Sequence, residues 1–390
     1  MGRLETYWEA VMLRGRPGVV PAGLRGCASA AAGVYARLIS LRNRAYDRGH
    51  LTGHTLPRPV VSVGNLSAGG TGKTPMVAYL VRELAGRGHV PAVLMRGYRP
   101  TRPAATRSDG RSAGITSDEA DELAEAFRGL RGVCVYADAD RVRGAAAVLA
   151  ASPDVDVFVL DDGFQHRRVR RDLDVVLVSA RQGLCEGRVL PRGLLREPPE
   201  GLRRADVVVL TRVEPGADVS GLEAEVRRWV RADVPLLKCW HEVEGVESLD
   251  GERFAPLRLR GRRVFLVAAT GDVGAFEASA VRLEAEVAGT WWGPDHHRYD
   301  KDDWDDIQRQ ARAAGASVIL TTGKDATKLR SLAAVPAGAA ARTDGTTPAP
   351  AEPPGEESVP VWVLRVGIRF HGDDGAELLQ RVERVIASRR

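Results

Sequence analysis

Residues 60 to 75 of the chain read Val-Val-Ser-Val-Gly-Asn-Leu-Ser-Ala-Gly-Gly-Thr-Gly-Lys-Thr-Pro. The valines predict a short buried strand, and the glycines after it permit a turn with positive φ, which residues carrying a Cβ resist. Lys73 and Thr74 then begin a helix, with Pro75 placed where a missing N–H costs little. A strand, a glycine-rich turn and a helix in this order direct several backbone N–H groups at an anion.

The turn is close to the phosphate-binding pattern G-x-x-x-x-G-K-[ST], although Ser67 stands where the first glycine is expected. In that pattern Lys73 reaches the β- and γ-phosphates and the Thr74 hydroxyl ligates Mg²⁺. The alternative is an ordinary glycine-rich loop, but Gly-Lys-Thr between a strand and a helix favours a nucleoside triphosphate. The predicted nucleotide-binding residues are Ser67, Ala68, Gly69, Gly70, Thr71, Gly72, Lys73 and Thr74.

Length and composition limit the possible classes of protein. A chain of 390 residues predicts two domains, and 44% hydrophobic residues is typical of a globular protein. No run approaches the ~20 apolar residues of a membrane span, and no apolar core of a signal peptide is expected at the N-terminus. The four cysteines lack metal or redox spacing, which suits a reducing cytosol.

The positive charge lies at the N-terminus. Residues 1–50 hold eight arginines and three acidic residues, which accounts for the whole net charge of +5. Residues 31–48 predict a helix whose apolar stripe is Val34, Tyr35, Leu38 and Leu41. Such a basic helix either lies on an anionic membrane surface or packs on its own domain. No aromatic residues are interleaved as in nucleic-acid-binding surfaces, so no nucleic-acid partner is expected.

Strand-like and helix-like segments alternate after the glycine-rich turn. Because this rhythm is typical of parallel sheets covered by helices, we expect an α/β protein with a P-loop NTPase-like doubly wound sheet. The alternation of strand-like and helix-like segments is interrupted near residue 235. We therefore expect a helical region at 1–50, a P-loop domain at 51–235 and a smaller α/β domain at 236–390. Residues 332–359 are rich in Ala, Pro, Gly and Thr and predict a flexible insertion in the second domain.

Two acids, Asp161 and Asp162, end an apolar strand downstream of the turn, as in a Walker-B segment. A carboxylate at that sheet edge holds Mg²⁺ directly or through water. Gln165 and His166 follow, at the crevice where ligands of such sheets bind. The alternative is a pair of acids capping a turn.

Other polar groups leave their roles open. Asp118 is a candidate general base, although one of several acids at a helix start is more simply a cap. Asp295-His296-His297 suggests either zinc, for which no third ligand is evident, or a histidine that orients a carboxylate base. The loop from 190 to 198 carries Arg192 and Arg196, which suit a phosphate or simply solvent. Thr321 to Asp325 follow a strand and loosely resemble a guanine-specificity loop, but GTP is not favoured.

The motifs taken together resemble the tetraacyldisaccharide 4′-kinase family of lipid A biosynthesis, in family order over residues ~30 to 370. The matching motifs are Val-Gly-Asn-Leu-Ser-Ala-Gly-Gly-Thr-Gly-Lys-Thr-Pro at 63–75, Arg-Gly-Tyr at 96–98, Asp-Glu at 118–119, Asp-Asp-Gly-Phe-Gln-His at 161–166, Leu-Pro-Arg-Gly-Leu-Leu-Arg-Glu-Pro at 190–198, Asp-His-His at 295–297 and Thr-Thr-Gly-Lys-Asp-Ala at 321–326.

The resemblance implies a kinase that transfers the γ-phosphate of ATP to the 4′-hydroxyl of an acylated glucosamine disaccharide 1-phosphate lipid, giving lipid IVA. It implies Asp118 as base with help from His296, and Lys73 as the catalytic cation. It implies Mg²⁺ on Thr74, Asp161 and Asp162, and a peripheral place on the cytoplasmic face of the inner membrane. The substrate-side residues are then Arg96, Tyr98, Gln165, His166, Arg196 and Glu197.

The sequence departs from the family pattern at Gly323, at residues 269–272, at Arg192 and in the insertion at 332–359. These departures concern the second domain and the acceptor rather than ATP. The main rival function is a P-loop GTPase or metallochaperone-type NTPase without a lipid acceptor, and a second is a non-catalytic membrane-binding module.

Overall fold

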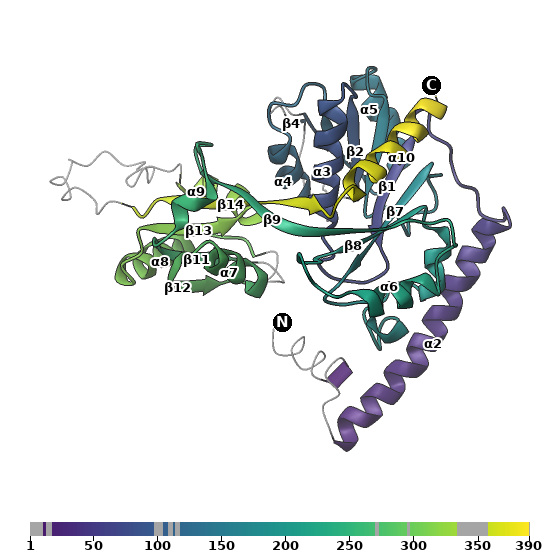
Figure 1. The fold of residues 1–390 in the computed structure, drawn as a ribbon, viewed down its shortest axis with the longest axis horizontal. Helices are drawn as coiled ribbons and strands as arrows, with labels where there is room; N and C mark the ends of the chain where they lie inside the picture. The colour runs from purple at the N-terminus through teal and green to yellow at the C-terminus, as the bar shows by residue number, and fades with distance from the viewer. Residues whose placement is uncertain are drawn as a thin grey trace, which may run out of the picture. The chain divides into compact units, whose positions relative to one another are not determined.

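The computed structural model describes residues 11–12, 18–96, 104–107, 112–113, 118–269, 273–294, 297–333 and 358–389. The chain forms two compact units (Figure 1). Unit 1 comprises Met1–Glu242 and Gly367–Arg390, and unit 2 comprises Val243–Val366.

The sheet of unit 1 has the phosphate-loop strand near its middle. Its strand order is β9-β8-β7-β1-β6-β2-β5-β3-β4. All pairs from β9 to β5 are parallel, whereas β3 and β4 add an antiparallel edge. The fold is therefore confirmed as α/β with a mostly parallel, doubly wound sheet. The strands are β1 (Val60–Asn65), β2 (Pro91–Met95), β3 (Ala104–Arg107), β4 (Ser112–Ala113), β5 (Cys134–Ala137), β6 (Val157–Asp161), β7 (Leu173–Ser179), β8 (Val207–Thr211) and β9 (Leu236–Ser248).

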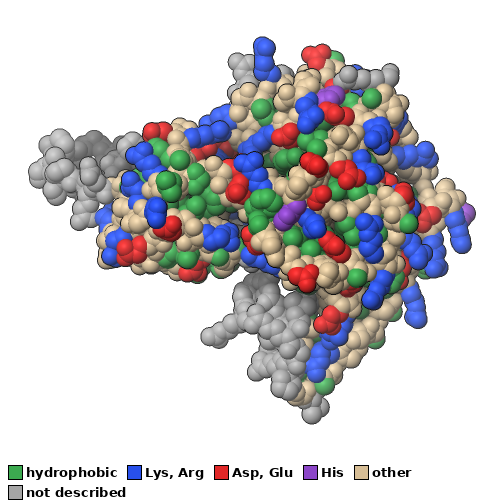
Figure 2. Space-filling view, in the orientation of Figure 1, with side chains coloured by type: hydrophobic (Ala, Val, Ile, Leu, Met, Phe, Trp, Pro, Cys, Tyr) green, Lys and Arg blue, Asp and Glu red, His purple; other side chains and the backbone are tan. Residues whose placement is uncertain are grey.

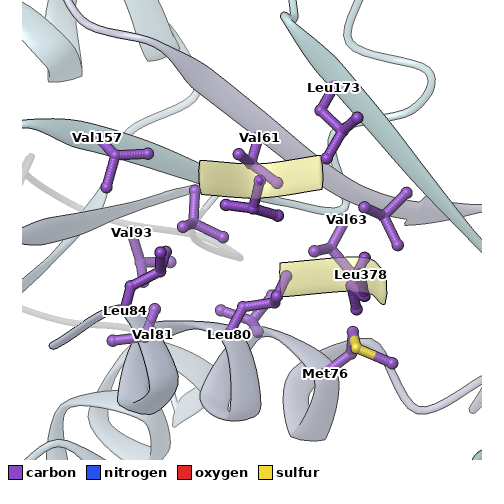
Figure 3. Close-up of a cluster of buried hydrophobic side chains, with 14 of the residues drawn as sticks. Val61, Val63, Met76, Leu80, Val81, Leu84, Val93, Val157, Leu173 and Leu378 are labelled. Atoms are coloured by element: carbon purple, nitrogen blue, oxygen red, sulfur yellow. The ribbon is translucent and has the colours of Figure 1, made fainter. Parts of the chain in front are cut away.

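Helix α3 (Lys73–Gly86) begins at the turn and packs on β1. Its residues Met76, Leu80, Val81 and Leu84 are 0% exposed and point toward the sheet (Figure 3), because their spacing of three or four residues places them on one helix face. The other helices of unit 1 are α2 (Val19–Asp47), α4 (Asp118–Ala126), α5 (Arg141–Ala151), α6 (Ser220–Arg227) and α10 (Asp374–Ser388), with short 3₁₀ turns η1 (Cys185–Gly187) and η2 (Pro199–Arg204).

The C-terminal helix α10 belongs to unit 1, whereas the sequence placed the tail in a second domain that begins at 236. Leu378, Leu379, Val382 and Ile386 of α10 are buried in the same hydrophobic cluster as β1 and α3. In Figure 3, Leu378 lies beside Met76 and Val63. An amphipathic sequence shows which face of a helix is buried but not which core receives it, so this return to unit 1 could not be predicted from the sequence.

Unit 2 is a second, smaller α/β arrangement. Strands β12, β11, β13 and β14 are neighbours in that order and pair in parallel. Its elements are the end of β9, β10 (Arg253–Phe254), η3 (Pro256–Leu259), β11 (Arg263–Ala268), α7 (Val273–Arg282), β12 (Glu286–Trp292), α8 (Lys301–Ala313), β13 (Val318–Thr322), α9 (Gly323–Ala333) and the start of β14 (Val361–Phe370). Most of the predicted insertion at 332–359 lies outside the described residues, as do residues 270–272.

The N-terminal helix α2 begins at Val19, well before the predicted start at residue 31. Figure 1 shows it as a long straight helix. Among the described residues, no helix is both long and apolar enough to cross a lipid bilayer.

Candidate active site

Hydrogen bonds from polar side chains of the turn and of the neighbouring strand β8 hold the phosphate-binding turn. Gly72 has φ 87 and caps α3, a conformation that glycine adopts without strain. The Asn65 side chain donates to Thr71 Oγ1 at 2.7 Å and accepts from Lys73 Nζ at 3.3 Å. From β8, the Thr211 hydroxyl donates to the Thr71 carbonyl at 2.9 Å. The turn is thus preorganised, with the helix N-terminus and Lys73 at its end.

Asp162 lies between two cations. Its Oδ1 is 3.6 Å from Lys73 Nζ, and both of its carboxylate oxygens are 2.7 Å from Arg196 Nη1. Burial alone raises the pKa of Asp162, but the charges of Lys73 and Arg196 outweigh it and hold that pKa below its usual value. Lys73, Asp162 and Arg196 therefore form one charged cluster at the end of the turn.

The loop that carries Arg196 is fastened to the start of the turn. Ser67 and Leu195 form an antiparallel bridge, Ala68 N donates to the Leu194 carbonyl at 2.7 Å, and Arg196 N donates to the Leu66 carbonyl at 2.6 Å. Backbone bonds of this kind fix the position of the loop, so the guanidinium of Arg196 reaches the sheet edge from a rigid support.

Glu197 was predicted to line the substrate site. In the structure its side chain is 0% exposed and makes hydrogen bonds only to other protein side chains among the described residues. Its carboxylate accepts from Gln165 Nε2 at 2.8 Å, from Arg204 Nη2 at 2.8 and 3.0 Å, and from Asn43 Nδ2 at 3.0 Å. Gln165 also donates to the Asn65 carbonyl at 2.8 Å. A carboxylate with four such bonds is satisfied within the protein and has no exposed surface to offer a substrate.

Arg141 at the start of α5 is a site residue that the sequence analysis missed. It is only 4% exposed, and burial lowers its pKa, while the charges of Asp162 and Asp161 favour its charged form. Asp140 caps the same helix, and its side chain accepts hydrogen bonds from two backbone N–H groups. It therefore fixes the start of α5 at Arg141. The sequence signal for Arg141 was an acidic and a basic residue directly after a strand. Only the fold brings Arg141 near enough to Asp161 for the two charges to interact.

His166 is neutral near pH 7. Burial and the nearby positive charges of Arg141, Arg171 and Arg168 lower the pKa of His166 from 6.5 to about 4. A neutral imidazole at this position donates or accepts a hydrogen bond without adding charge.

Several predicted residues cannot be placed fully. Tyr98 and His296 lie outside the described residues, and Asp118 begins α4 without a described side chain. Arg96 follows β2 and is exposed. The neighbouring His297 binds Asp303 through Nε2 at 2.7 Å within unit 2. The base Asp118 and its partner His296 therefore stay predictions.

Helix α2 touches the site with one face. The Tyr35 hydroxyl donates to the Arg196 carbonyl at 2.7 Å, and Arg42 Nη2 donates to the Gln165 carbonyl at 3.3 Å. Another face is exposed and apolar, and basic side chains lie among the hydrophobic ones over this helix (Figure 2). The exposed hydrophobic residues of α2 are Val20, Leu24, Val34, Leu38 and Leu41.

Few side-chain oxygen atoms near the turn could act as metal ligands. Within the described parts of the chain, no cluster of three or more histidine, cysteine or acidic side chains is arranged to hold a metal. The Thr74 hydroxyl at the start of α3 and the carboxylates of Asp161 and Asp162 at the end of β6 are oxygen ligands of the kind that Mg²⁺ takes together with phosphates.

Comparisons with known proteins point to one family. A family model described as tetraacyldisaccharide-1-P 4′-kinase matches residues 27–383. A Geobacter metallireducens protein named tetraacyldisaccharide 4′-kinase is 43% identical over 303 residues, covering 76% of this chain and 86% of that protein. One of the same name from Anaeromyxobacter dehalogenans (strain 2CP-C) is 39% identical over 335 residues, covering 85% of this chain and 88% of that protein. The crystal structure of LpxK from Aquifex aeolicus in complex with ATP matches with a TM-score of 0.68 and 28% identity, covering 93% of this chain and 99% of that one.

Proposed function

The chain belongs to the tetraacyldisaccharide-1-P 4′-kinase (LpxK) family, and on that premise we propose how its residues carry out phosphoryl transfer. The protein is an ATP-dependent kinase that phosphorylates the 4′ position of a tetraacyldisaccharide 1-phosphate, a lipid A precursor. The observation that carries the mechanism is the cluster of Lys73, Asp162 and Arg196 at the end of the phosphate-binding turn.

The turn and its cations serve the nucleotide. Backbone N–H groups from Ser67 to Thr74 bind the phosphate chain, and Lys73 stabilises negative charge on the transferring group. Arg196 offers a guanidinium to the same group, and Asp162 holds both cations in place until the nucleotide arrives. Because these side chains are already positioned by hydrogen bonds, little reorganisation is needed when charge develops.

Asp118 is the proposed general base. The 4′-hydroxyl oxygen attacks the γ-phosphorus, the bond from that phosphorus to the β–γ bridging oxygen breaks, and the hydroxyl proton passes to the Asp118 carboxylate, leaving ADP. His296 is assigned the role of orienting this carboxylate. The family resemblance supports both roles, and the position of Asp118 at the first residue of α4 is compatible with a base carried by a helix start.

Mg²⁺ is the proposed metal, held by Thr74, Asp161 and Asp162. The donor set fits, because Mg²⁺ in kinases binds one or two carboxylates and takes its remaining ligands from phosphates and water. When bound, it neutralises charge on the β- and γ-phosphates. The lowered pKa of Asp162 keeps that carboxylate in the ionised form that a metal ligand requires.

The acceptor and the membrane are the proposed partners of α2. Its exposed leucines and valines suit acyl chains or the bilayer interface, and its arginines suit anionic head groups. A peripheral place on the cytoplasmic face of the inner membrane follows for a kinase that takes ATP and a lipid. Leu38→Glu should reduce co-sedimentation of the protein with anionic vesicles. Unchanged co-sedimentation would contradict a role of α2 in membrane binding.

The function is tested by phosphate transfer. We expect labelled phosphate to pass from ATP to a disaccharide 1-phosphate lipid with wild-type protein, and transfer to fall by at least ~100-fold with Lys73→Ala, because that cation stabilises the transferring group. Exposed Lys301 on α8 provides the matched control as Lys301→Ala.

The rival without a lipid acceptor makes a different prediction. A GTPase or metallochaperone-type NTPase would hydrolyse GTP at a rate indifferent to added lipid. That rival is not favoured, since the relatives that match most of the chain are named kinases.

A further inference from the structure

Arg212 has a strained backbone next to the phosphate-binding turn. It follows β8 directly and has φ 61, a left-handed conformation that is uncommon for residues other than glycine, asparagine and aspartate. Its neighbours hold it there: Thr211 is 0% exposed, and Val213 N donates to the Cys239 carbonyl at 3.0 Å. Strain of this kind persists where the surrounding structure fixes it, and it gathers at functional sites.

The strained residue places its side chain against the turn. Arg212 Nη2 lies 3.7 Å from the point that a Cβ on Gly70 would occupy. The preceding Thr211 is bonded to the Thr71 carbonyl at 2.9 Å. The end of β8 and the turn are therefore in direct contact, and Arg212 is half-buried at that contact.

The direction of the nucleotide follows from the strand order. The Lys73 ammonium is 3.6 Å from Asp162, which follows β6, and β6 neighbours β1 on one side. The end of the triphosphate that reacts lies at this lysine. The nucleoside at the opposite end of the chain therefore extends toward the other side of β1, where β7 and then β8 lie.

We propose that the guanidinium of Arg212 stacks on the purine ring of the bound nucleotide and forms one wall of the base site. A planar guanidinium stacks well on an aromatic face and is less strongly hydrated than an ammonium. The proposal rests on the binding of the triphosphate by the turn and names the residue that recognises the other end of the same molecule.

A contact with phosphate is the competing role for Arg212. The turn already supplies backbone N–H groups, Lys73 and a helix N-terminus to the phosphates, whereas Arg212 follows β8, on the side of β1 toward which the nucleoside extends. The two roles differ in one measurable respect, because a base contact matters to ATP and not to inorganic tripolyphosphate, which lacks the base.

The test compares these two ligands by calorimetry on the full chain. We expect Arg212→Ala to weaken ATP binding roughly tenfold, as for a cation–π contact of about 1.4 kcal/mol, and to leave tripolyphosphate binding within about twofold. Arg212→Gly should do the same without lowering the melting temperature, because glycine accepts positive φ. Arg384→Ala, an exposed arginine on α10, is the control and should change neither affinity.

Two outcomes overturn the proposal. Equal weakening of ATP and tripolyphosphate would assign Arg212 to the phosphates or to the shape of the turn, and unchanged ATP affinity in both variants would leave it no role in binding. Failure here is separate from failure of the kinase function, because Lys73→Ala should weaken both ligands and wild-type transfer to lipid does not depend on where the base lies.

Discussion

At Asp162, burial and charge act on the pKa in opposite directions. Burial raises the pKa of this carboxyl, but Lys73 and Arg196, at 3.6 and 2.7 Å, hold it below its usual value. Removing either cation leaves a partly buried charge with less compensation, which costs both stability and the position of the remaining partner. The three side chains therefore act as a unit, and single substitutions among them should not have additive effects.

Asp118→Asn tests the proposed base. The amide keeps the shape but cannot accept the hydroxyl proton, so we expect kcat to fall by at least ~100-fold while the affinity for ATP changes little. Steady-state kinetics and a separate ATP titration measure the two effects. Asp121→Asn, on the same helix, is the control, and a wild-type kcat in Asp118→Asn would refute the role.

His166 makes stability depend on pH. Its pKa is lowered from 6.5 to about 4 in the folded protein, so between these values the unfolded chain binds a proton that the folded protein does not. The free energy of unfolding therefore falls as pH decreases from about 6.5 to about 4, by an amount on the order of 1 kcal/mol, because solvent screens this half-buried imidazole. Urea unfolding of His166→Gln should lose this part of the pH dependence.

The control for His166 is His50→Gln, a change at an exposed histidine outside the site. It should keep the wild-type slope between pH 4 and 6.5. Identical pH profiles for wild type and His166→Gln would mean that the imidazole is not held neutral by its surroundings.

Strand β1 and the segment after β6 approach each other closely enough to require a glycine. A Cβ on Gly64 would lie 2.6 Å from Phe164 Cβ and 2.7 Å from Phe164 N, distances that no real contact allows. Phe164 is itself 0% exposed and lies under the Arg204 guanidinium at 4.4 Å from the ring centroid. The acidic end of β6 is thus positioned against the phosphate-loop strand by a missing side chain.

Gly64→Ala should destabilise the protein by about 1–3 kcal/mol, because the added methyl group must displace Phe164 or the backbone. Chemical denaturation measures this loss. Gly26→Ala in α2, where a Cβ meets nothing within 4 Å, is the matched control and should be neutral or stabilising by up to about 1 kcal/mol. Equal stability of both variants would show that the contact at Gly64 relaxes freely.

The sequence predicted elements well where local chemistry determines them. The valines, glycines and Gly-Lys-Thr of residues 60–75 specify β1, the turn and the start of α3 through their local backbone preferences. Arg141 was missed because a buried charge depends on neighbours far along the chain, and Glu197 was misassigned because a motif shows that a residue matters but not whether it faces substrate.

At the scale of the whole chain, unit 1 is built from two separated segments. Strand β9 begins at Leu236, where the second domain was expected to start, but Gly367–Arg390 then returns to unit 1. The return is fixed by polar contacts as well as by the apolar face of α10. His371 N donates to the Lys238 carbonyl at 3.0 Å, and Lys238 N donates to Asp374 Oδ2 at 2.6 Å.

A chain cut at residue 235 should therefore not fold as an independent P-loop domain. It lacks the part of the core filled by Leu378, Leu379, Val382 and Ile386, each fully or almost fully buried, and losing even one large buried side chain typically costs 2–5 kcal/mol. Joining residues 1–242 to 367–390 through a short Gly/Ser linker should restore the fold, because Arg369 Nε already lies 2.7 Å from Glu242 Oε2. Circular dichroism melting and ATP titration distinguish the two chains: the joined chain should unfold cooperatively and bind ATP, and the cut chain should do neither. Cooperative unfolding of the chain that ends at 235 would mean that α10 is an accessory to the core of unit 1 and not part of it.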